Sequence, residues 1–139
     1  MILSDEAATR AAGARLAAAL QGGESIALIG ELGAGKTTFV AGLVEALGGG
    51  LASSPTFALL NEYPGGRLIV WHCDLYRIDR ERELAELGLD DVIGDPRGVL
   101  LVEWADKFAV LPEGHTRIEL RHAPEGRELV ATGPLATSL

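Results

Sequence analysis

A glycine-rich motif in the first third of the chain constrains its fold more than any other feature of the sequence. Residues 30–37 read G-E-L-G-A-G-K-T, which matches the phosphate-binding pattern G-x-x-x-x-G-K-[ST] in full. The glycines let backbone N–H groups turn inward around phosphate oxygens, and a following helix would point its positive end at them. Lys36 would then reach the terminal phosphates, and the Thr37 hydroxyl would bind Mg²⁺. Because an apolar run precedes the motif and a helical pattern follows it, we interpret it as a nucleotide-binding loop rather than a glycine turn with a surface lysine.

The order of periodic segments predicts an α/β fold. A hydroxyl cap at Ser4 is expected to begin a helix that ends near Leu20. An apolar run at 25–29, typical of a buried parallel strand, and a helix at 36–47 frame the glycine motif. The other segments are two hairpins, a charged surface helix and an apolar strand, at residues 56–63 with 68–74, 116–122 with 128–132, 79–86 and 99–102. We therefore predict a single domain over residues 1–139, a P-loop NTPase-like mixed sheet with flanking helices, parallel core strands and antiparallel hairpins.

Charge and cysteine content narrow the classes of protein that fit. The 139 residues carry a net charge of −8, so a broad basic surface that grips nucleic acid by itself is not expected. The single cysteine, Cys73, cannot form an internal disulfide and fits a reducing compartment. No apolar run approaches the roughly 20 residues that span a bilayer, and the N-terminal segment carries acids where an export signal needs basic residues. We expect a cytoplasmic protein with no membrane contact.

Two acidic residues that end apolar runs are candidates for the metal and water positions that a phosphate-binding loop requires. Glu103 follows the run at 99–102, and Asp74 ends the run at 68–74. The carboxyl ends of parallel strands border the ligand site in folds of this class. Two plainer interpretations stay open: Glu103 as an exposed strand-end carboxylate, and Asp74 as a turn or helix-cap residue.

The sequence favours ATP over GTP. The guanine-specific N-K-x-D signature is missing, because Asp106 rather than asparagine precedes Lys107. A D-x-x-G match at residues 91–94 lacks the apolar strand that leads into this motif in GTPases.

Four sequence blocks, in this order, are similar to the TsaE family, the small bacterial ATPase subunit of the machinery that forms threonylcarbamoyladenosine in tRNA. They are G-E-L-G-A-G-K-T-T at residues 30–38, S-P-T-F at 54–57, H-C-D-L-Y-R at 72–77 and L-V-E-W at 101–104. The first block is shared by many NTPases, whereas the second and third are specific. The likeness spans about residues 5–104, and residues 105–139 match only in length and strand-rich character.

The resemblance implies a P-loop fold that binds ATP and ADP and hydrolyses ATP with Mg²⁺. It also implies partnership with the TsaD and TsaB proteins, which modify the adenosine beside the anticodon of tRNAs reading codons that begin with A. In this family the subunit supports repeated turnover by its partners and hydrolyses ATP poorly alone. Contact with tRNA would arise through the complex, and direct contact is left open.

The resemblance also implies residue roles. The phosphates would be bound by residues of the glycine motif, namely Gly33, Ala34, Gly35, Lys36, Thr37 and Thr38. Glu6, at the start of the first helix, would lie near the adenine. Thr37 and Glu103 would hold Mg²⁺, and the implied catalytic residues are Lys36, Asp74 and Glu103. Whether Asp74 or Glu103 orients the attacking water is open.

A second implied set comprises switch and partner-contact residues. Ser54, Pro55 and Thr56 resemble a mobile switch beside the γ-phosphate, and the proline restricts Ser54 to an extended shape; a plain strand-entry turn is the alternative. His72, Tyr76 and Arg77 flank Asp74 either as a catalytic cluster or as a docking patch for a partner or RNA. In the plainer interpretation the two rings are half-buried and the arginine pairs with an acid. Trp104 packs over the nucleotide site or belongs to the core or an interface.

Two other functions compete with an ATPase subunit. A small-molecule kinase would use the arginines of residues 77–82 as a lid, but little chain remains to form an acceptor pocket. A nucleotide-sensing module would bind without turnover. No arginine can be assigned as a finger from the sequence, and Arg117, Arg121 and Arg127 offer at most a local contact to RNA or a partner.

Overall fold

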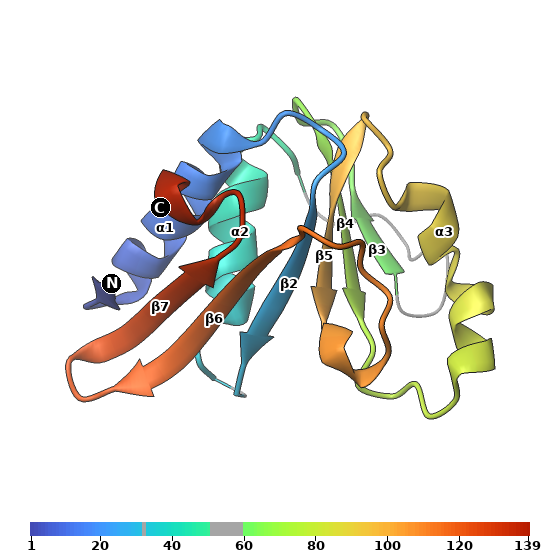
Figure 1. The fold of residues 1–139 in the computed structure, drawn as a ribbon. Coiled ribbons are helices and arrows are strands. Elements are labelled where there is room, and N and C mark those ends of the chain that lie inside the picture. The colour runs from blue at the N-terminus through green and yellow to red at the C-terminus, as the bar shows by residue number, and fades with distance from the viewer. Residues whose placement is uncertain (32, 51–59) are drawn as a thin grey trace.

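A central mixed β-sheet organises the chain. In the computed structural model, which describes residues 1–31, 33–50 and 60–139, the described strands form one seven-stranded sheet in the order β1-β7-β6-β2-β5-β4-β3. The strands are β1 (Ile2–Leu3), β2 (Ser25–Gly30), β3 (Leu60–Tyr63), β4 (Ile69–Asp74), β5 (Gly98–Glu103), β6 (Thr116–Ala123) and β7 (Gly126–Thr132). Helices α1 (Glu6–Ala19) and α2 (Lys36–Ala46) and the short α3 (Leu89–Val92) lie around it (Figure 1).

The centre of the sheet is parallel and its flanks are antiparallel. β2 pairs in parallel with both β5 and β6, and β5 pairs in parallel with β4. The hairpins β3–β4 and β6–β7 and the pair β1–β7 are antiparallel. The carboxyl ends of β2, β4 and β5 point to the same edge of the sheet (Figure 1). The predicted combination of parallel core strands and antiparallel hairpins is thereby confirmed.

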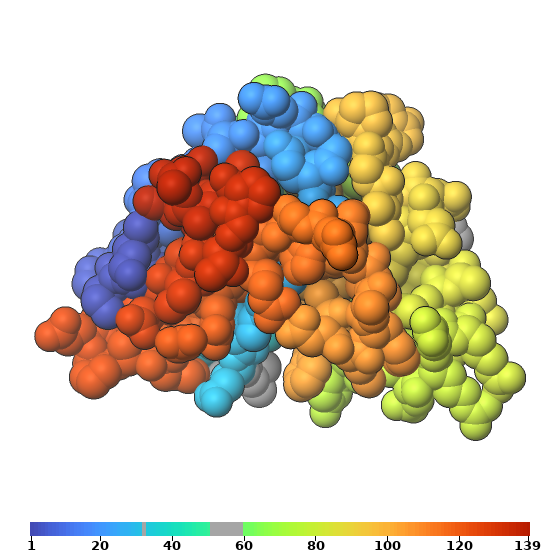
Figure 2. All heavy atoms as spheres, in the orientation of Figure 1, coloured from blue at the N-terminus to red at the C-terminus, as the bar shows by residue number. Residues whose placement is uncertain are grey.

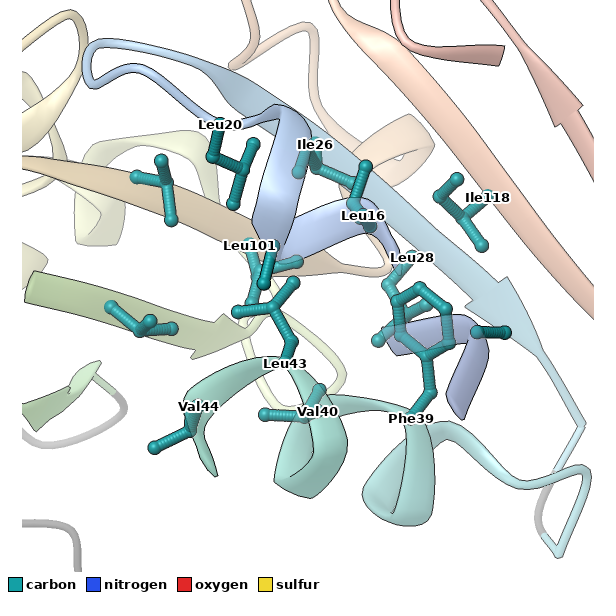
Figure 3. Packing of buried hydrophobic residues seen from close by; sticks show 14 of the residues in the cluster. Leu16, Leu20, Ile26, Leu28, Phe39, Val40, Leu43, Val44, Leu101 and Ile118 are labelled. Atoms are coloured by element: carbon teal, nitrogen blue, oxygen red, sulfur yellow. The ribbon is translucent and has the colours of Figure 1, made fainter. Parts of the chain in front are cut away.

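Alternate residues of the central strands face two separate hydrophobic cores. Ile26 and Leu28 of β2 pack with α1 and α2, whereas Ala27 between them packs with the segment after β4. The first core joins leucines of both helices to the sheet, as the close view in Figure 3 shows for Leu16, Leu43 and Leu101. Because β2 is buried on both faces, its run of consecutive apolar residues is required rather than incidental.

Helices α1 and α2 cross at two glycines. A Cβ added at Gly42 would lie 2.1 Å from the carbonyl oxygen of Arg10, and one added at Gly13 would lie 2.2 Å from that of Phe39. Neither distance leaves room for any side chain, because the atoms in the way belong to backbone. The absence of a side chain at both positions therefore sets how closely the two helices approach.

Several element boundaries differ from the sequence-based expectations. Asp5, not Ser4, caps α1: it is extended at φ −155°, and its carboxylate accepts the Ala8 N–H at 2.8 Å. Ser4 is one residue farther from Ala8, beyond the spacing at which a capping side chain accepts a backbone N–H. The charged helix expected at 79–86 is a 3₁₀ segment, Glu81–Leu87. Part of the strand expected at 56–63 lies outside the described residues, and β3 is described from Leu60.

The N-terminus adds the outermost strand of the sheet beside β7. The short strand β1, which the sequence did not indicate, pairs with β7, and the Met1 ammonium donates to the Leu129 carbonyl at 3.2 Å. N-terminal and C-terminal residues accordingly lie side by side at one end of the molecule (Figure 2, blue and red). Among the described residues, no helix has the length and apolar character needed to cross a membrane.

Candidate active site

The glycine motif forms the turn between β2 and α2. β2 ends at Gly30, α2 begins at Lys36, and both Gly33 (φ +79°) and Gly35 (φ +104°) have left-handed backbone conformations that disfavour a side chain. Gly35 caps α2 without any side-chain hydrogen bond. The first N–H groups of the helix are thus left for another acceptor, and a phosphate group at this positive helix end would supply it.

A cleft of about 1810 Å³ adjoins this turn at the carboxyl edge of the sheet. Its volume exceeds the roughly 300 to 1,000 Å³ of common ligand pockets, so it has room for a nucleotide. The cleft brings together ten of the residues that the sequence analysis singled out: Glu6, Gly33, Gly35, Lys36, Thr37, Thr38, Asp74, Tyr76, Glu103 and Trp104. These residues come from α1, the loop, α2 and the ends of β4 and β5, and only the fold makes them neighbours.

Glu103 is bound through both oxygens of its carboxylate. Lys36 Nζ lies 3.0 Å from Oε1, and His72 Nε2 lies 2.7 Å from Oε2. Because an ionised carboxylate can only accept hydrogen bonds, the His72 nitrogen is the donor. All three side chains are largely buried, with exposed fractions of 12% for Glu103, 15% for His72 and 17% for Lys36.

The surroundings of Glu103 favour its ionised form. Burial by itself raises the pKa of this carboxyl, but the hydrogen bonds from His72 and Lys36 and their charges outweigh it and lower the pKa below its ordinary value. The carboxylate is therefore negatively charged at neutral pH, as a ligand for Mg²⁺ must be.

Asp74 lies beside Glu103 across the β4–β5 pair. The two residues are register partners, but Asp74 is exposed, and its Oδ1 accepts the Tyr76 N–H at 2.9 Å. The turn interpretation of Asp74 and the metal interpretation are thus compatible. One carboxylate is held inside by two donors, and the other faces the cleft.

The oxygen donors at this edge fit Mg²⁺ bound together with a nucleotide. Within residues 1–31, 33–50 and 60–139, no three or more His, Cys, Asp and Glu side chains gather into a ready metal site. Mg²⁺ does not need such a cage, since it commonly takes one or two protein oxygens and completes its shell with phosphates and water. The Thr37 hydroxyl and the carboxylates of Glu103 and Asp74 are donors of that kind, on the wall of one cleft.

Trp104, the residue after Glu103, forms an aromatic wall of the cleft with Tyr76. The two ring centroids are 5.2 Å apart, and the side chains are 51% and 60% exposed. Trp104 is the non-glycine residue with a left-handed backbone (φ +61°) in the described part of the chain, and such conformations cost about 1 kcal/mol or more. Trp104 therefore belongs to the cleft rather than to the core.

Three of the remaining candidates are described by the structure, and none of the three lines the cleft. Ala34 is buried beneath the loop, and His72 is turned inward on Glu103 rather than exposed as a docking residue. Arg77 is exposed and does not line the cleft in the part of the chain that the structure describes. The three switch residues Ser54, Pro55 and Thr56 lie outside the described residues.

The structure brings Arg127 to the site, where the sequence analysis did not place it. Arg127 of β7 donates from Nη2 to the Gly33 carbonyl at 2.9 Å and lines the cleft. The two residues are 94 positions apart, so no local pattern could have indicated the contact. Arg121 also lines the cleft and pairs with Glu119, whereas Arg117 pairs with Asp106.

Cys73 provides a direct check on the strand geometry at the site. Its thiol is fully buried, and burial, together with the nearby charge of Asp74, raises its pKa from 9.0 to about 12. The raised pKa makes the thiolate fraction at pH 8 about 1,000-fold smaller than for an ordinary cysteine. Only the thiolate reacts with alkylating reagents, so the reaction slows accordingly. We expect iodoacetamide at pH 8 to leave the folded chain unlabelled over a time in which the chain in guanidinium chloride is fully labelled, as measured by intact mass. Equal rates in the two states would contradict the buried position.

Known proteins match this chain over most of its length. The family model for "Threonylcarbamoyl adenosine biosynthesis protein TsaE" matches residues 3–129. A relative named tRNA threonylcarbamoyladenosine biosynthesis protein TsaE from Bacillus subtilis is 40% identical, over 89% of this chain and 78% of its own. The protein of the same name from Nostoc is 37% identical, over 91% and 80%. The crystal structure of Bacillus subtilis YdiB superposes with a TM-score of 0.75 at 34% identity, over 93% of this chain and 80% of that one.

Proposed function

This chain belongs to the TsaE family, which takes part in tRNA threonylcarbamoyladenosine biosynthesis, and from that premise we propose that it is a Mg²⁺-dependent ATPase subunit. Its substrate is ATP, its product ADP, and its activity supports the TsaB and TsaD proteins as they form N6-threonylcarbamoyladenosine next to the anticodon of tRNAs reading codons that begin with A. The observation that best supports the proposal is the contact of Lys36, from the phosphate-binding turn, with Glu103 at the end of the adjacent strand. This pairing puts a cation for phosphate and an anion for metal in one cleft.

Each part of the cleft has a role in this proposal. The backbone N–H groups from Gly33 to Thr38 hold the phosphates, and Lys36 neutralises the charge on the terminal ones. Thr37 and Glu103 hold Mg²⁺, which when bound draws charge from the phosphate oxygens. Asp74 faces the cleft beside them and accepts a hydrogen bond from the attacking water. Glu6, at the start of α1, borders the same cleft, and in this proposal it contacts the adenine.

The contacts of the arginines around the cleft support the expectation that the isolated chain hydrolyses ATP slowly. Arg127 is engaged with the Gly33 carbonyl, and Arg121 with Glu119. A positioned arginine increases the rate of phosphoryl transfer by about 10³- to 10⁵-fold. In many NTPases a partner protein provides this arginine. We expect TsaD and TsaB to complete the site in this way or by ordering the chain around it.

Steady-state ATP turnover tests the proposal. The rate is measured with Mg²⁺ for the chain alone and with purified TsaD and TsaB, with Lys36→Ala as the blank in each case. We expect slow hydrolysis alone, a several-fold increase with both partners and no activity above background in the variant. A rate that the partners leave unchanged would contradict the proposal. Phosphate transfer to a metabolite without partners would favour the kinase, and tight ATP binding without turnover would favour the sensor.

A further inference from the structure

His72 holds the half of the Glu103 carboxylate that faces away from Lys36. The strand alternation explains its direction: Trp71 and Cys73, on either side of it in β4, pack into the core on one face, so His72 projects from the other. On that face its Nε2 meets Glu103 Oε2 at 2.7 Å, across the β4–β5 pair. The contact is the shorter of the two that the carboxylate makes.

The two contacts of Glu103 differ in what ATP would do to them. Lys36 belongs to the phosphate-binding turn, and the ammonium group of such a lysine moves onto phosphate oxygens when a nucleotide is bound. His72 lies on β4, between β5 and β3 in the sheet, and is not among the described residues that line the cleft. Its hydrogen bond is therefore the one that can persist in both states, and a glutamate with several free torsions gains a fixed orientation only from a partner that persists.

We propose that His72 is a positioning residue, which fixes Glu103 Oε2 so that Oε1 remains directed into the cleft for the metal of a Mg²⁺–nucleotide complex. This inference rests on the proposed function, because it assigns Glu103 to Mg²⁺. Hydrogen bonds to a metal-bound side chain commonly change metal affinity by about 10- to 100-fold. The predicted effect is on the coupling between Mg²⁺ and nucleotide, and nucleotide binding without metal is unaffected.

Three substitutions separate positioning from simple packing. Glutamine carries its amide nitrogen about as far from the backbone as histidine carries Nε2, so His72→Gln can still donate to Glu103. Asparagine is shorter and cannot reach, and alanine has no donor. The control is His115→Gln, at a histidine that bonds the Pro112 carbonyl and is not among the described residues that line the cleft.

The measurement is the dissociation constant of ADP, determined by calorimetry in excess Mg²⁺ and in EDTA, for each purified full-length variant. We expect Mg²⁺ to strengthen ADP binding by the wild-type chain and by His115→Gln. In His72→Ala and His72→Asn this strengthening falls about 10-fold, whereas the constant in EDTA stays within about 2-fold of wild type. His72→Gln should retain most of the strengthening. If His72→Ala does not fold, the comparison of the glutamine and asparagine variants decides alone.

The outcomes distinguish this inference from the function on which it rests. Full Mg²⁺ coupling in His72→Asn, or equal losses in Mg²⁺ and in EDTA for all three variants, would overturn the positioning role while leaving the ATPase proposal intact. No ADP binding by the wild-type chain would overturn both. Because the readout is binding, it holds even if hydrolysis is too slow to measure without TsaD and TsaB.

Discussion

Replacing Glu103 with glutamine is expected to lower ATP turnover by about 100-fold or more. The substitution keeps the size of the side chain but removes the charge that Mg²⁺ requires, and a catalytic metal stabilises its transition state by several kcal/mol. Each 1.4 kcal/mol lost is about tenfold in rate. Metal-free ADP binding should change only a few-fold, since the loop N–H groups and Lys36 remain. Turnover with TsaD and TsaB, and ADP binding in EDTA, are the two measurements.

A second variant that removes one negative charge elsewhere controls for a general electrostatic effect on the turnover rate. Glu125→Gln removes one negative charge at the exposed β6–β7 turn, outside the described lining of the cleft, and should keep the wild-type rate. If Glu103→Gln also keeps it, Glu103 is not a metal ligand, and its contacts with Lys36 and His72 serve the fold alone. Asp74→Asn completes the set, because a loss of rate at unchanged Mg²⁺ dependence would assign the attacking water to Asp74.

The parts of the site that the sequence predicted are those that depend on neighbouring residues. The glycine motif requires its own turn, and an apolar run followed by Glu103 puts that carboxylate at a strand end. Alternation along β4 also carries information about His72: Val70 packs in one core, Trp71 and Cys73 in the other, so His72 shares the face of Val70. The direction of His72 was thus available from the pattern, but the distance to Glu103 was not.

The parts that the sequence could not predict depend on packing between distant segments. Arg127 reaches Gly33 only because β7 folds back beside β6, and β1 forms only because β7 presents a free edge. The 3₁₀ segment Glu81–Leu87 has a helical composition but only its Leu87 is buried. Intrinsic propensity favours a helix there, and tertiary packing decides how tightly it winds.

Substituting Gly42 with alanine is expected to destabilise the chain by about 2 kcal/mol, although alanine is the better helix former. The gain in helix propensity is about 1 kcal/mol. Against it, the new methyl would lie 2.1 Å from the Arg10 carbonyl oxygen, a backbone atom of α1 that cannot rotate away. Overpacking of this kind costs about 1 to 3 kcal/mol, or more where backbone must shift. Urea denaturation followed by circular dichroism gives the difference in free energy of unfolding.

Gly50→Ala is the control, because the same methyl there meets nothing within 4 Å among the residues that the structure describes. It should leave the free energy of unfolding within about 0.5 kcal/mol of wild type. Saturating ADP should stabilise wild type and Gly42→Ala by a similar amount. Stabilisation by a ligand depends on its affinity and concentration. The affinity should not change, because Gly42 is more than one helical turn from Lys36. A Gly42→Ala chain as stable as wild type would show that α1 and α2 can separate freely. The two glycines would then reflect helix composition rather than a close approach that holds α2, and with it the phosphate-binding turn, against the sheet.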